Sequence, residues 1–91
     1  MNVFHPGHDD LHGQTVVLFT DGPRTYVGRW NAQEGDGILM MGASVHDTSA
    51  GDEGDGPAWV ETVKQYGFGA EHASLVVPAD EVTRVVRLRD A

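Results

Sequence analysis

The pattern of apolar and polar positions predicts three strands in the first half of the chain. Residues 15–20, "TVVLFT", are a run of β-branched and apolar side chains typical of a strand. Residues 24–31, "RTYVGRWN", alternate with the period of a half-buried strand, and a third strand is expected over residues 38–47. The sequences "DGP" (21–23) and "QEGDG" (33–37) supply the turns between them.

Two glycines interrupt the second and third of these strands. A glycine inside a strand usually marks a bulge or a sharp bend, because it has no side chain to pack. A strand bent in this way can belong to two sheets at once, which is how small barrels close. We therefore expect a bend at Gly28 and a similar one at Gly42.

Two interpretations of residues 57–67, "PAWVETVKQYG", stay open. As a helix, the segment has Asp55 near its cap, Pro57 in its first turn and Gly67 as a stop. As a strand, it alternates passably and is rich in valine, threonine and aromatic residues. The cap and the stop favour a helical insertion before the fourth strand.

The remaining segments are a loop and two further strands. Residues 48–56, "TSAGDEGDG", are acidic and glycine-rich, so we expect a mobile loop without regular structure. Residues 74–88 predict a strand, a tight break at Pro78, which lacks a backbone donor, and a final strand. Residues 1–13 are expected to be a partly flexible tail with a short turn, within a single domain over residues 1–91.

Composition narrows the classes of function. The chain has no cysteine, which excludes disulfides, thiol catalysis and thiolate metal sites. Its apolar runs are far shorter than the roughly 20 residues that span a bilayer, and it begins without the features of a signal peptide. We therefore expect a cytoplasmic protein without a membrane segment. Six basic and fourteen acidic residues give a formal charge of −8, which makes nucleic-acid binding doubtful because affinity for phosphates depends on Lys and Arg.

Five expected strands, a bent second strand and a tight break before the last one resemble the Sm-like family, which includes bacterial RNA chaperones. "LHGQTVVLFTDGPRTYVGRW" and "GILMMGA" match its first motif, and "LVVPADEVTRVV" lies over its second. The end of the chain is also similar to a group of small uncharacterised bacterial proteins with such a barrel. The resemblance implies an all-β fold, a strongly bent five-stranded Sm-like or SH3-like barrel.

The chain departs from the family where the family binds uracil. The resemblance implies an aspartate and an asparagine in the loop after the second strand, but Gly37 stands at the asparagine, and only Glu34 or Asp36 can replace the aspartate. The arginine-glycine pair of the second motif has become Pro78-Ala79, which removes charge and stacking. The sequence predicts that the shape is kept and the uracil pocket is lost.

No motif indicates an enzyme, since a glycine-flanked serine, a phosphate-binding loop and a cysteine nucleophile are all missing from the sequence. The leading hypothesis is a non-enzymatic Sm-like module, without a cofactor, that forms a homo-oligomer and binds a protein partner or a small ligand. The second hypothesis is an RNA-binding protein that uses a non-standard surface built from Arg84, Arg87 and Arg89. Candidate residues for a ligand or RNA are Trp30, Glu34, Asp36, Arg84 and Arg87.

A third hypothesis is a metal-binding protein. The N-terminal sequence "HPGHDDLHG" offers His5, His8 and His12 as ligands suited to zinc, nickel or copper, although a flexible segment binds weakly. Two further histidines, His46 and His72, stand at strand ends and are expected to be solvated.

The last two expected strands carry apolar residues on both faces, which suggests burial against a neighbour. The resemblance implies that the fourth strand of one subunit pairs with the fifth strand of the next and closes a ring. A dimer is an alternative, and so is a monomer whose helix covers the exposed edge of the sheet. The candidate interface residues are Leu75, Val77, Val82, Val85, Val86 and Leu88.

Overall fold

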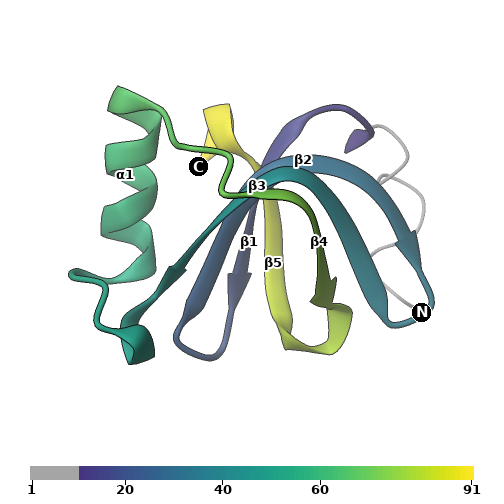
Figure 1. Cartoon of the computed structure of the whole chain (residues 1–91), viewed down its shortest axis with the longest axis horizontal. Helices are drawn as coiled ribbons and strands as arrows, with labels where there is room; N and C mark the ends of the chain where they lie inside the picture. Colours follow the sequence, from purple (N-terminus) through teal and green to yellow (C-terminus); the bar gives the residue numbers. More distant parts are fainter. Residues whose placement is uncertain (1–10) are drawn as a thin grey trace.

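A computed structural model describes residues 11–91, which form one antiparallel sheet of five strands in the order β4-β3-β2-β1-β5 (Figure 1). The strands are β1 (Thr15–Thr20), β2 (Arg24–Glu34), β3 (Gly37–Asp47), β4 (His72–Pro78) and β5 (Val82–Arg87). The helix of the described residues is α1 (Gly56–Tyr66), and short 3-10 turns include η2 (Thr48–Ala50), η3 (Ala79–Glu81) and η4 (Leu88–Asp90). The predicted all-β architecture of five strands with a helix before the fourth is confirmed.

Glycine bends curl this sheet. The pairing of β2 with β3 shifts register between Val27 and Arg29, which are the neighbours of Gly28. A Cβ atom at Gly28 would lie 2.9 Å from the Cβ of Ala43, so only glycine allows the two strands to approach this closely. On the facing strand, Gly42 has φ +57°, a left-handed conformation that favours glycine. Both expected bends are therefore present.

Residues 57–66 lie in helix α1, which resolves the two open interpretations. The Asp55 carboxylate accepts a hydrogen bond from the backbone N–H of Ala58 at 2.7 Å, and Gly67 ends the helix with φ +82°. Val60 and Val63 bury one face of the helix against the sheet, beside Val17 and Val27. Figure 1 shows α1 standing at one side of the curled sheet.

A separate inner core lies inside the curl. Alternation along β1 sends Val16 and Leu18 to this core while Val17 faces α1. Trp30 is 3% exposed and belongs to the inner core, as its large ring favours. None of the helices in the described part of the chain, residues 11–91, is long and apolar enough to cross a membrane.

The structure corrects two expectations from the sequence. Residues 48–50 of the acidic loop form the turn η2, because the Asp47 carboxylate accepts a hydrogen bond from the N–H of Ser49 at 2.9 Å. The mobility of the loop stays a prediction. His46 is 4% exposed rather than solvated, because it packs against Trp59 and bonds to the loop.

Candidate functional site

The two edge strands are the first candidate surface, because β4 and β5 each have one side that no other strand of residues 11–91 pairs with. Val76 of β4 is 63% exposed, and with Tyr66 it makes up the exposed large apolar side chains of residues 11–91. The sequence prediction missed Val76. Its signal was the alternation of "LVV", since Leu75 and Val77 point inward and leave Val76 outside.

The predicted interface residues divide into two groups. Val77 and Val82 are buried in the inner core of their own chain. The others are half-buried, so part of each side chain stays available to a neighbour, and they are Leu75, Val85, Val86 and Leu88. Leu88 lies in η4, just beyond the end of β5.

The loops that the family resemblance connects with uracil do meet in space. The N–H of Ala79 donates a hydrogen bond to the backbone oxygen of Asp36 at 2.6 Å, and Gly37 pairs with Pro78. Glu34 and Asp36 are both exposed at this place. The surface therefore presents carboxylates without an arginine, which disfavours a phosphate.

The three arginines proposed for RNA divide between two hollows. The Arg84 guanidinium lies 5.3 Å from the centre of the Phe19 ring, and both residues line a hollow beside α1. Arg87 and Arg89 line a different hollow together with Lys64. These arginines are close together in the sequence, but in the structure Arg84 lies apart from Arg87 and Arg89.

The predicted metal ligands are only partly described. His5 and His8 lie outside the described residues, and His12 is exposed. Within residues 11–91, no group of three or more His, Asp or Glu side chains is placed to hold a metal ion.

An electrostatic cluster lies where β3 ends. The Asp47 carboxylate accepts a hydrogen bond from the Ser49 hydroxyl at 2.5 Å and pairs with the Arg24 guanidinium at 3.1 Å. The hydrogen bond from Ser49, helped by Arg24, lowers the pKa of Asp47 below its ordinary value. This arrangement stabilises a turn, and nothing in it points to catalysis.

Comparisons with known proteins agree with this geometry at the level of the fold. Neither a protein-family model nor a curated protein sequence matches the chain. Among solved structures, the chain is similar to a Pyrococcus abyssii Sm protein in complex with a uridine heptamer, with 10% sequence identity and a TM-score of 0.58. The match covers 91% of this chain and 99% of the other.

Proposed function

Starting from an Sm-like fold, we propose that this protein is a non-enzymatic module that self-associates through the free edges of β4 and β5. The observation that carries the proposal is Val76, an apolar side chain 63% exposed on an unpaired strand edge. Unpaired N–H and C=O groups along such an edge recruit another strand unless the edge is covered or charged.

The edge of β4 lacks the usual protection. Its sequence, "HASLVVP", holds no Lys, Arg, Asp or Glu, and Pro78 stands only at its end. Helix α1 buries its valines against β1 and β2 and does not cover β4, which weakens the monomer alternative. Pairing β4 of one subunit with β5 of the next would cover Val76 and satisfy both edges.

Such a contact is heterologous, because two different edges meet. It therefore closes into a ring or continues as a fibre. We propose a closed ring, and a dimer is the alternative outcome of the measurement.

RNA binding is the second candidate, since the similar Pyrococcus abyssii protein was solved with a uridine heptamer. In this chain the corresponding loops carry Glu34, Asp36 and Pro78-Ala79, which do not favour a phosphate. RNA would have to bind another surface.

The test of self-association is the solution mass by light scattering at tens of micromolar protein. We expect a defined multiple of the subunit mass for the wild type and a single subunit mass for Val76→Lys, because a buried lysine at the edge is unfavourable. Gln65→Lys, an exposed position on α1, is the matched control and should leave the assembly intact. A wild-type monomer, or a Val76→Lys variant that stays assembled, contradicts the proposal.

A further inference from the structure

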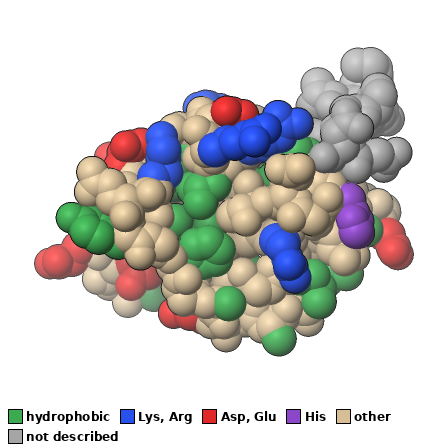
Figure 2. All heavy atoms as spheres, turned by 90° about the horizontal axis from the view of Figure 1, so that it is seen from above, with side chains coloured by type: hydrophobic (Ala, Val, Ile, Leu, Met, Phe, Trp, Pro, Cys, Tyr) green, Lys and Arg blue, Asp and Glu red, His purple; other side chains and the backbone are tan. Residues whose placement is uncertain are grey.

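A hollow of about 540 Å³ lies at the end of the barrel where β1 begins and β5 ends. Three distant parts of the chain line it: Gln14 and Thr15 at the start of β1, Lys64 on α1, and residues 87–89, where β5 ends and η4 begins. Its size falls within the range of small-molecule sites, roughly 300–1,000 Å³. Figure 2 looks down on this end of the molecule.

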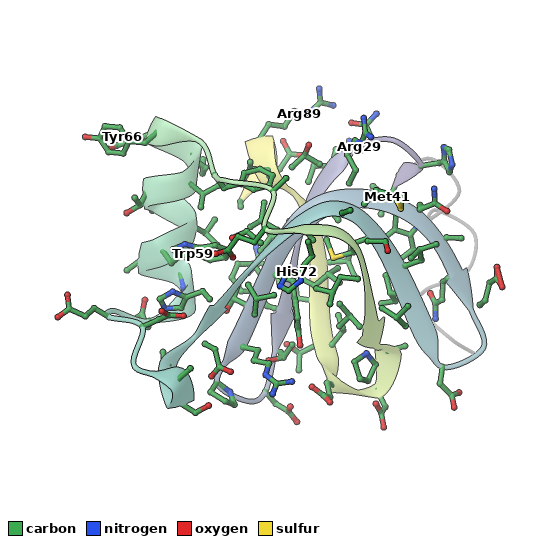
Figure 3. The ribbon with its side chains drawn as sticks, in the orientation of Figure 1. Arg29, Met41, Trp59, Tyr66, His72 and Arg89 are labelled. Carbon is green, nitrogen blue, oxygen red and sulfur yellow. The ribbon has the colours of Figure 1, made fainter. Side chains whose placement is uncertain are left out.

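Basic side chains gather at this end although the chain as a whole is acidic. Lys64, Arg87 and Arg89 line the hollow, and Arg29 is the cross-strand partner of Thr15, whose Cβ atom is expected about 5 Å away. Figure 3 shows Arg29 and Arg89 at the same end of the molecule. Three of the six Lys and Arg residues of a chain with a net charge of −8 therefore line one hollow, and a fourth, Arg29, is paired with a lining residue on the next strand.

The protein itself satisfies these cations only in part, and Lys64 also donates a hydrogen bond to the backbone oxygen of Ala91. Arg87 lies 3.9 Å from Asp90 and Lys64 lies 3.7 Å from Glu61, and both carboxylates are more than half exposed. Within residues 11–91, Arg29 and Arg89 form no ion pair. Two carboxylates thus face four cations, so the surroundings of the hollow keep a surplus of positive charge.

Arg87 also carries a buried donor without a partner. Its Nε atom is inaccessible to solvent and has no hydrogen-bond partner among the described residues. Burying part of a cation in this way costs free energy, and a negative charge placed beside the guanidinium would offset that cost.

We propose that this hollow binds the phosphate group of a small phosphorylated ligand. Guanidinium groups match phosphate oxygens with paired N–H donors, and Lys64 adds a point charge from α1. The acidic remainder of the surface repels an extended polyanion, which favours a compact ligand over RNA. The inference does not depend on self-association.

The experiment is a titration with inorganic pyrophosphate followed by backbone amide NMR. We expect saturable shifts at Gln14, Thr15 and residues 87–89, with a dissociation constant below about 1 mM. The double variant Lys64→Gln/Arg89→Gln should weaken binding roughly tenfold or more, since it removes two charge-assisted bonds. The matched control Arg24→Gln/Arg84→Gln removes two charges that do not line the hollow and should change the affinity less than about twofold.

Two further measurements identify the class of phosphorylated ligand and test whether ligand binding is independent of self-association. A nucleoside triphosphate that binds tighter than ribose 5-phosphate indicates a nucleotide, and the reverse order indicates a sugar phosphate; either order supports the site. Light scattering on Lys64→Gln/Arg89→Gln should give the wild-type mass. The proposal is overturned by the lack of saturable shifts, by equal losses in both double variants, or by a single-stranded oligonucleotide that displaces pyrophosphate at lower concentration than any small phosphate.

Discussion

The imidazole of His46 is stacked on the indole of Trp59, with ring centroids 5.2 Å apart and planes inclined by 17°. The Nε2 atom of His46 also lies 2.8 Å from the backbone oxygen of Gly54, so the nitrogen that faces this carbonyl carries the proton. One side chain at the end of β3 thus joins the acidic loop to α1.

Removing His46 should therefore loosen both the loop and the helix. We expect His46→Ala to lower the free energy of unfolding by about 2 kcal/mol, from a lost ring contact and a lost hydrogen bond. His46→Phe keeps a ring and should lose about half as much. Urea unfolding measures both values, and equal losses in the two variants would show that the stacked ring contributes nothing.

Gly28→Ala should destabilise the barrel by about 1–3 kcal/mol, because the new methyl group would lie 2.9 Å from the Cβ of Ala43. Gly22→Ala is the matched control, since a Cβ atom there meets nothing within 4 Å. Thermal unfolding of the two variants checks the prediction. An unchanged melting temperature for Gly28→Ala would mean that β2 and β3 separate at little cost.

Stability should fall in acid partly through Asp47. Its pKa is lowered in the folded protein by the Ser49 hydroxyl and by Arg24, so its contribution is complete above the ordinary aspartate pKa of about 4. The contribution is lost as the pH falls below that value through the lowered pKa. As the pH falls from 5 to 2, roughly the window in which this carboxylate titrates, the free energy of unfolding should fall less in the Asp47→Asn variant than in the wild type. Parallel curves for the two proteins over this window would refute the assignment.

Single-stranded oligo-uridine should bind no tighter than about 100 μM at physiological salt, the weak end of non-specific affinity. The reason is the exposed Glu34 and Asp36 beside Pro78-Ala79, where no arginine contributes. Fluorescence anisotropy measures the affinity. A micromolar complex that survives moderate salt and weakens in variants of residues 34–37 would contradict this prediction.

The sequence by itself determined which segments form strands and which forms the helix. Strand periods, the cap at Asp55 and the glycine at Gly28 are local signals, since each depends on residues a few positions apart. The resemblance to the Sm-like family followed from the same order of strands and turns, and the solved structure of an Sm protein supports it at the level of the fold.

Only the tertiary structure decided which side chains share a surface. Periodicity tells which face a residue occupies, but the curl of the sheet sets which distant faces meet. His46 is buried against Trp59, although the sequence predicts a solvated side chain for a polar residue at a strand end. Arg84 and Arg87 also line different hollows. Arg87 shares its hollow with Lys64, because η4 packs against the helix.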